Sequence, residues 1–173
     1  ISTAPFNPGT TYTLTLNGLT DQAAAANAVA ANSQAQFTAA SLSYADIGSP
    51  AVGGSIVSTP DGFNITAGGT NITGAADQFT LGYNQITGDF DIKLRVQSFT
   101  AAQPWARGGL MARETLAANS RFAATMAGPS VLGEFFQSRV TAGADATTSG
   151  WHPVNHPYTW MRLSRAGNVF SGY

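Results

Sequence analysis

The chain has 173 residues, of which 43% are hydrophobic and only 10% are charged, so it holds enough apolar material for a core and is not intrinsically disordered. Its net charge is −1, and its seven arginines and single lysine, Lys93, are dispersed, which argues against nucleic-acid binding. The absence of cysteine excludes disulfides and thiolate chemistry, and no apolar run is long enough to span a bilayer.

The first forty residues predict two strands separated by an alanine-rich loop. The first strand covers Tyr12–Leu16 and ends at Asn17-Gly18, and the second covers Gln34–Thr38. Between them, Asp21–Ala31 has no apolar stripe wider than alanine, so we expect a loop with at most a short helical turn. Residues 40–43 predict a linker.

Residues 44–173 predict many short strands separated by glycine-rich turns. The clearest strand is Phe90–Val96, in which apolar and polar residues alternate over seven positions, so that one face is buried and the other is wet. Hairpin turns are expected at Asp61-Gly62 and at Ala166-Gly167-Asn168. The other expected strands are Gly54–Thr59, Phe63–Ala67, Phe79–Tyr83, Gly109–Thr115, Arg121–Met126, Val131–Arg139, Tyr158–Arg165 and Asn168–Tyr173. Such spacing is typical of an all-β sandwich or barrel.

Residues 1–39 resemble the last strands of a bacterial Ig-like domain. The resemblance rests on Pro8-Gly9-Thr10-Thr11-Tyr12-Thr13-Leu14, on Gly18-Leu19-Thr20-Asp21 and on Gln36-Phe37-Thr38. It implies an Ig-like β-sandwich of which two or three strands are present.

Residues 44–173 resemble the concanavalin A-like (jelly-roll) sandwich modules of secreted bacterial proteins. Three segments carry the resemblance: Ala45–Pro50, Ala76–Ile92, and Pro104–Glu114 with its Trp-Ala-Arg-Gly-Gly-Leu-Met-Ala-Arg-Glu sequence; the close at Trp160–Tyr173 also fits. Such modules continue past the strand that ends at Tyr173, so the resemblance implies a sandwich incomplete at its C-terminal end, whose open edge another chain could fill.

Catalysis is not expected. Glycosidases of similar fold place two carboxylates on one strand face, roughly 5 Å apart for a retaining mechanism. Glu114 and Glu134 are the only glutamates, and neither has a second carboxylate two or four residues further on. Glu114 is expected to make surface polar contacts instead.

Tryptophan and arginine side chains offer the candidate ligand site. Trp105, Trp151, Trp160 and Tyr158 fit either the sandwich core or a carbohydrate platform, because the C–H faces of sugars stack on aromatic rings. Trp105 and Trp160 are expected in the core, and Trp151 in an exposed loop. The arginines that share strands with them would hydrogen-bond sugar hydroxyls. The candidate ligand-binding residues are Trp105, Arg107, Arg113, Trp151 and Arg162.

No cofactor is expected, and a metal site is not predicted. His152 and His156 are separated by a spacing that joins two imidazoles only on a helix, which Pro153 and Pro157 forbid, so exposed loop histidines are expected. Calcium stays an open alternative at turn-rich carboxylates, namely Asp46, Asp77, Asp89 and Asp91.

Two functions remain open from the sequence. The chain is expected to be extracellular or at the cell surface, as its cysteine-free, weakly charged composition suits an exported bacterial β protein. The first hypothesis is a non-catalytic module that recognises polysaccharide. The second is a structural subunit of a fibre or matrix, a homo-oligomer joined through strand edges.

Overall fold

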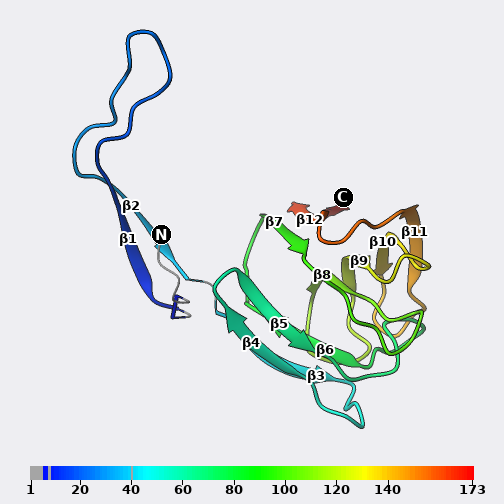
Figure 1. Cartoon of the computed structure of the whole chain (residues 1–173). Helices are drawn as coiled ribbons and strands as arrows, with labels where there is room; N and C mark the ends of the chain where they lie inside the picture. The colour runs from blue at the N-terminus through cyan, green and yellow to red at the C-terminus, as the bar shows by residue number, and fades with distance from the viewer. Residues whose placement is uncertain (1–5, 8, 40) are drawn as a thin grey trace. The chain divides into compact units, whose positions relative to one another are not determined.

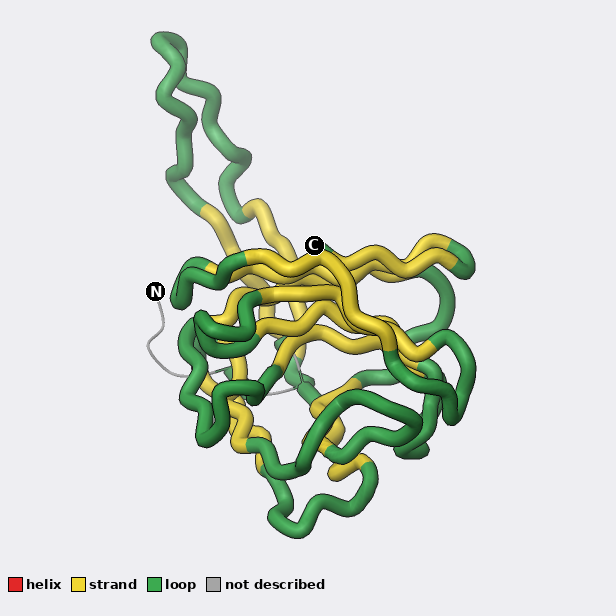
Figure 2. Tube along the Cα trace, turned by 90° about the vertical axis from the view of Figure 1, so that its right-hand side faces the viewer, coloured by secondary structure: helices red, strands yellow, loops and turns green. Residues whose placement is uncertain are grey.

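The computed structural model describes residues 6–7, 9–39 and 41–173, and this part of the chain is all-β, as the sequence predicts. It contains thirteen strands and no helix (Figures 1 and 2). Among these residues, no helical segment capable of crossing a membrane is present. The residues at 1–5 and 8, which open the predicted Ig-like part, and residue 40 of the predicted linker lie outside the described residues.

The chain divides into two compact units, and the first consists of residues 1–43 and 56–65. It holds the hairpin of β1 (Thr11–Leu16) and β2 (Ser33–Thr38), with Tyr12 opposite Phe37. The rings of Phe6, Tyr12 and Phe37 cluster on one face, with centroids 4.6 to 5.8 Å apart.

The alanine-rich segment between β1 and β2 is a loop, as predicted, and Asp21 organises it. The Asp21 carboxylate accepts hydrogen bonds from the backbone N–H of Ala23 and Asn27 and from the Asn27 amide. Carboxylate contacts of this kind stabilise turns in place of a helix.

A second hairpin joins β4 (Ser55–Thr59) and β5 (Gly62–Thr66), and its turn lies at the predicted Asp61-Gly62. The central parts of both strands belong to the first unit.

The second unit, residues 44–55 and 66–173, contains two larger antiparallel sheets. One has the order β11-β10-β9-β8 and the other β13-β12-β7. Strands β3 and β6 form a further two-stranded sheet. The bounds are β3 Ser43–Ile47, β6 Phe79–Tyr83, β7 Phe90–Val96, β8 Gly108–Arg113, β9 Phe122–Ala127, β10 Glu134–Arg139, β11 Thr147–His152, β12 Thr159–Ala166 and β13 Val169–Gly172.

The two larger sheets pack face to face, as in a β-sandwich. Strand β12 contacts β8 and β9, and its inward side chains Met161 and Leu163 are almost fully buried. Burying side chains of this size stabilises the fold by about 1.5–3 kcal/mol each. Gly172 on β13 lies against the ring of Phe136 on β10, which leaves no room for a side chain there.

The opposite face of the four-stranded sheet is also covered. Phe122, Met126 and Phe135 pack there with Ile72 and Leu132, and Phe79 of β6 lies against this cluster. Because both of its faces are covered, every residue of β9 is buried, and its sequence Phe-Ala-Ala-Thr-Met-Ala lacks the alternation of a one-sided strand.

Two strands were not predicted. Strand β3 begins at Ser43, inside the predicted linker, and β11 contains Trp151, which was expected in a loop. In β11, Gly150 has a φ of 67° and the register with β10 shifts between Glu134 and Phe136. This bulge breaks the period of two on which the sequence prediction depends.

Candidate functional site

The outward-facing side of β7, β12 and β13 gathers aromatic and cationic side chains. On β12, Thr159, Met161 and Leu163 are buried, so Trp160 and Arg162 between them point outward. The register places Trp160 opposite Arg95 of β7, and Arg162 opposite Lys93. Reciprocal backbone hydrogen bonds also pair Arg162 with Tyr173, just beyond β13. We call this surface the outer face; it comprises Asp91, Lys93, Arg95, Trp160, Arg162 and Tyr173.

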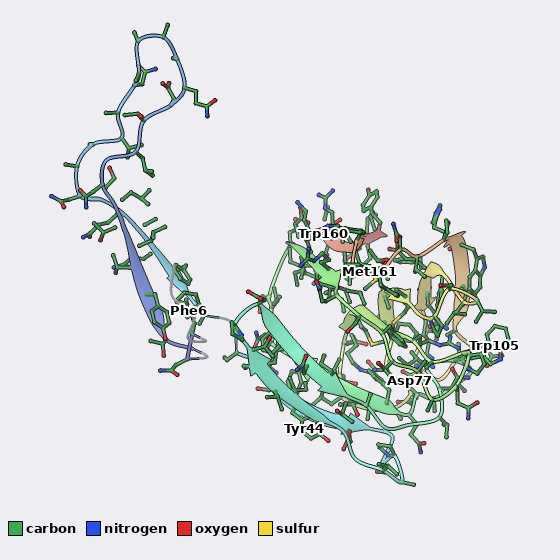
Figure 3. All side chains as sticks on the ribbon, in the orientation of Figure 1. Phe6, Tyr44, Asp77, Trp105, Trp160 and Met161 are labelled. Atoms are coloured by element: carbon green, nitrogen blue, oxygen red, sulfur yellow. The ribbon has the colours of Figure 1, made fainter. Side chains whose placement is uncertain are left out.

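The two aromatic rings of the outer face are open to solvent and flanked by guanidinium groups. Trp160 is 63% exposed and Tyr173 is 66% exposed. The Arg95 guanidinium carbon lies 5.8 Å from the Trp160 ring centroid, and that of Arg162 lies 5.3 Å from the Tyr173 ring. These cation–π contacts hold the arginines beside the rings. Figure 3 marks Trp160 on β12, next to the inward-facing Met161.

The carboxylate on the outer face belongs to Asp91, and it is paired with Arg162. Nε and Nη2 of Arg162 donate to the two Asp91 oxygens at 2.8 and 2.7 Å. This bidentate hydrogen bond lowers the pKa of Asp91 and raises the pKa of Arg162. Lys93 and Arg95 form no ion pair with any described residue.

The predicted ligand-binding residues do not form one surface. Only Arg162 lies on the outer face. Arg107 and Trp151 both approach Phe135: the Arg107 guanidinium is 5.6 Å from that ring, and the Trp151 ring centroid is 4.7 Å from it. Trp105 lies well away from Trp160 in Figure 3.

Two tryptophans expected in the core are exposed instead. Trp105 and Trp160 are each 63% exposed, so the prediction that they fill the sandwich was wrong. Trp105 precedes β8 in an irregular segment, and Trp160 occupies an outward position of β12. The exposure predicted for Trp151 was correct, at 57%.

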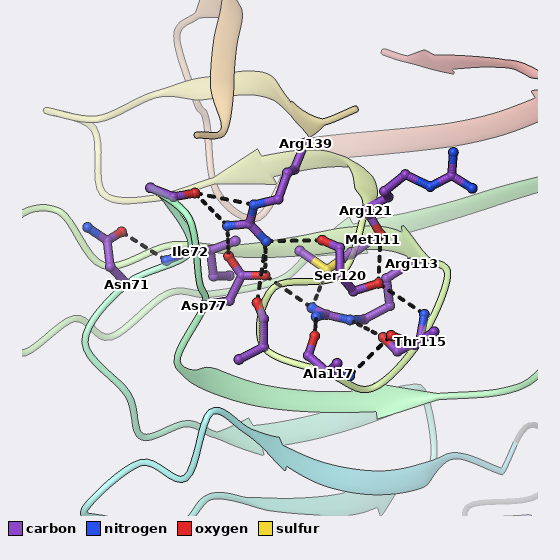
Figure 4. A network of polar contacts seen from close by, with 12 residues as sticks. Asn71, Ile72, Asp77, Met111, Arg113, Thr115, Ala117, Ser120, Arg121 and Arg139 are labelled. Atoms are coloured by element: carbon purple, nitrogen blue, oxygen red, sulfur yellow. Dashed lines mark hydrogen bonds and ion pairs between the residues drawn. The ribbon is translucent and has the colours of Figure 1, made fainter. Parts of the chain in front are cut away.

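Arg113 belongs to a buried network and offers no surface for a ligand (Figure 4). Its side chain is 4% exposed, and its Nη1 lies 3.4 Å from an Asp77 oxygen. Arg139 approaches the same carboxylate from β10, with both partners fully buried, at 2.6 and 2.9 Å. The remaining Arg139 donors reach the carbonyl oxygens of Gly74, Ala144, Ala118 and Ser120. Because the Arg113 side chain is buried and pairs with Asp77, Arg113 is part of the protein interior.

Each of the four aspartates considered for calcium accepts hydrogen bonds from donors of its own. Asp77 binds the two arginines, Asp91 binds Arg162, and Asp89 accepts from the Gly167 N–H at 2.7 Å. Asp46 accepts from the hydroxyls of Tyr44 and Thr80. No group of three or more metal-ligating side chains occurs among the described residues. Calcium binding stays the open alternative that it was from the sequence.

Glu114 and Glu134 lie at opposite ends of the four-stranded sheet. Glu134 pairs with Ala127, which is opposite Gly108 at the start of β8, whereas Glu114 follows the last residue of β8. Six residues of extended strand separate these ends by about 20 Å. Glu114 makes the expected surface contact, a bidentate pair with Arg121 at 2.7 and 2.9 Å. Burial raises the pKa of Glu134.

The histidines differ from the expectation that both lie exposed in a loop. His152 is exposed but ends strand β11. His156 is half-buried, its ring stacks on Phe99 at 6.3 Å, and its Nε2 lies 3.3 Å from the Gly128 carbonyl oxygen.

A shallow hollow of about 470 Å³ is lined by residues outside the outer face. It is lined by Phe99, Ala101, Ala102, Gln103, Pro104, Pro129 and Val131. Gln103 is the only lining side chain that carries polar atoms, so the hollow has few groups to orient a ligand.

Sequence reasoning missed most of the outer face, although the signals were present. The alternation in Phe90–Val96 already puts Lys93 and Arg95 on the wet side of the strand. The same alternation on the later strand, with Met161 and Leu163 facing inward, places Trp160 outward. Comparison with protein-family models, with curated proteins and with solved structures found no match for this chain.

Proposed function

We propose that the chain is a non-catalytic, extracellular recognition module that binds polysaccharide on the outer face. The observation that carries the proposal is the pair of solvent-exposed rings, Trp160 and Tyr173, held on a regular sheet among hydrogen-bond donors. Its parent is a multi-domain bacterial surface or secreted protein, in line with the resemblance of residues 44–173 to concanavalin A-like modules and of residues 1–39 to an Ig-like domain.

The spacing of the rings suits a chain of sugars. Tyr173 lies opposite Arg162, two residues from Trp160, so the aromatic positions are one strand apart and one repeat along the strand. This diagonal corresponds to about 7–8 Å between side-chain bases. Two rings at that separation present apolar area to successive sugar units, and Arg95 and Arg162 can donate to hydroxyl groups at their rims.

A glycan array probed with the full chain and with Trp160→Ala tests the proposal. The full chain is expected to bind a defined subset of polysaccharides, and Trp160→Ala should weaken that binding at least about tenfold, the usual effect of removing a central aromatic anchor. Because Trp160 is 63% exposed, its removal should leave the fold intact, as circular dichroism can verify.

Trp105→Ala is the matched control, since Trp105 has the same exposed fraction but lies elsewhere on the second unit. It should bind like the unmodified chain. Equal losses in the two variants, or an array without any bound glycan, would refute recognition by the outer face.

The alternative function, a structural subunit joined by strand edges, stays a prediction. Strands β7 and β13 are the edges of their sheet, and each pairs on one side only among the described strands. Such edges are capable of pairing with another chain. The mass of the assembled species in solution would test it, and a stable monomer would count against it.

A further inference from the structure

We infer that the polysaccharide recognised by the outer face is acidic, carrying carboxylate or sulfate groups. The inference rests on the proposed function and names the class of glycan. It follows from the distribution of charge on the outer face, which differs from that of the whole chain.

Positive charge is concentrated on the outer face although the chain as a whole has a net charge of −1. Three of the eight basic residues lie there, namely Lys93, Arg95 and Arg162, and they come from two strands that are distant in the sequence. Among the six side chains that define the outer face, the only carboxylate is that of Asp91, which pairs with Arg162. Lys93 and Arg95 therefore leave an uncompensated charge of about +2, which an anionic ligand would neutralise.

Other charges near these strands do not cancel this excess. Asp89 precedes β7, and its carboxylate accepts a hydrogen bond from the backbone of Gly167 in the β12–β13 turn. Arg165 lies on the inward side of β12, where its guanidinium is 5.5 Å from the Phe170 ring centroid. Asp89 is four residues before Lys93 and six before Arg95, about 13 and 20 Å along an extended strand, and Arg165 faces inward.

The two uncompensated cations lie beside the exposed tryptophan. Lys93 and Arg95 are two residues apart on β7, so they share a face at a spacing of about 6.8 Å. Arg95 is directly opposite Trp160, and Lys93 is its diagonal neighbour. A sugar stacked on Trp160 would place an acidic substituent within reach of both cations. The fork of Arg95 suits bidentate contact with a carboxylate or sulfate.

The experiment compares polygalacturonate with its fully methyl-esterified form, which has the same sugar backbone without the charge, and dextran sulfate with dextran. The full chain should bind at least one charged polymer at least about tenfold more tightly than its neutral counterpart, and the preference should shrink when salt is raised from about 0.05 M to about 0.5 M. Lys93→Gln and Arg95→Gln should each weaken binding of that polymer about three- to fivefold, and Lys93→Gln should change binding of neutral glycans less than twofold.

Arg121→Gln removes the same charge from a surface outside the outer face, where Arg121 pairs with Glu114, and should leave binding unchanged. Binding that requires Trp160 but does not prefer the charged polymer would overturn this inference and leave the proposed function standing. If the full chain binds no glycan, charged or neutral, both this inference and the proposed function are overturned. Equal affinity for single-stranded DNA would also overturn the inference, because the face would then recognise charge alone.

Discussion

Asp77 is the shared partner of two buried arginines in the interior of the second unit. Its carboxylate is fully buried and neutralises Arg139, which is equally buried, and it also contacts Arg113. The guanidinium of Arg139 lies 5.0 Å from the ring of Phe122, and that of Arg113 lies 5.3 Å from the ring of Phe79. The network thus ties the segment before β6 to strands β8 and β10, with its donors satisfied by backbone carbonyls.

Asp77→Ala is expected to lower the free energy of unfolding by about 3–5 kcal/mol, because it leaves two buried guanidinium groups without a counter-charge. Burial already lowers the pKa of Arg113, and Asp77 opposes that effect. Urea denaturation followed by tryptophan fluorescence measures the change.

Asp145→Ala is the control for this substitution, since Asp145 is exposed and should change stability by less than about 0.5 kcal/mol. If both variants unfolded at the same urea concentration, the network would not have the structural importance assigned to it.

For single residues, the sequence predicts surface contacts between nearby residues better than it predicts buried contacts between distant ones. The expectation that Glu114 makes surface contacts is confirmed by its pair with Arg121. By contrast, Arg113 was expected to meet a ligand, and its partner Asp77 to lie in a turn-rich segment. No local pattern reveals that two residues 36 positions apart pair inside the protein, because that contact depends on how the strands fold together.

Among the elements, β8 shows how a close approach of strands requires glycine. A Cβ on Gly109 would overlap the carbonyl oxygen of Thr125 on the neighbouring strand β9. A Cβ on the adjacent Gly108 would meet only a Phe99 ring carbon at 3.5 Å, an ordinary contact. Two consecutive glycines in one strand therefore have different roles.

Gly109→Ala should destabilise the protein by more than about 1 kcal/mol, because β8 has to move away from β9 to relieve the overlap. Gly108→Ala should be neutral or slightly stabilising, since alanine has less conformational freedom to lose on folding than glycine. Thermal unfolding of both variants gives the comparison. A larger loss at position 108 than at position 109 would contradict the packing described for β8.

Strand prediction is most accurate for β7 and fails for β3 and β11. Phe90–Val96 was predicted with its bounds because inward and outward residues alternate throughout β7. Strand β11 was missed because its bulge interrupts the period, and β3 because the segment around it reads as linker and turn. The sequence also gave no means of pairing β12 with β7, so the outer face could be assembled only once the register was known.

For the whole molecule, the buried residues are distributed unevenly between the two units. Every buried side chain among the described residues lies between Ile47 and Leu163, within the second unit. The β1–β2 hairpin contains no buried residue, and Leu14 is 50% exposed. An isolated two-stranded hairpin is marginally stable in water, so this hairpin should contribute little to the cooperative unfolding of the chain.

A chain shortened to residues 41–173 should therefore unfold cooperatively within about 2 °C of the full chain, since it keeps every residue of the buried hydrophobic cluster. Circular dichroism melting of both chains measures the difference, and near-ultraviolet signals from the three tryptophans, all within the second unit, report on its packing. A fall of more than about 5 °C, or loss of cooperativity, would mean that residues before 41 bury surface essential to the core. In that case the stability of the second unit could not be assigned to its two packed sheets and the Asp77 network alone.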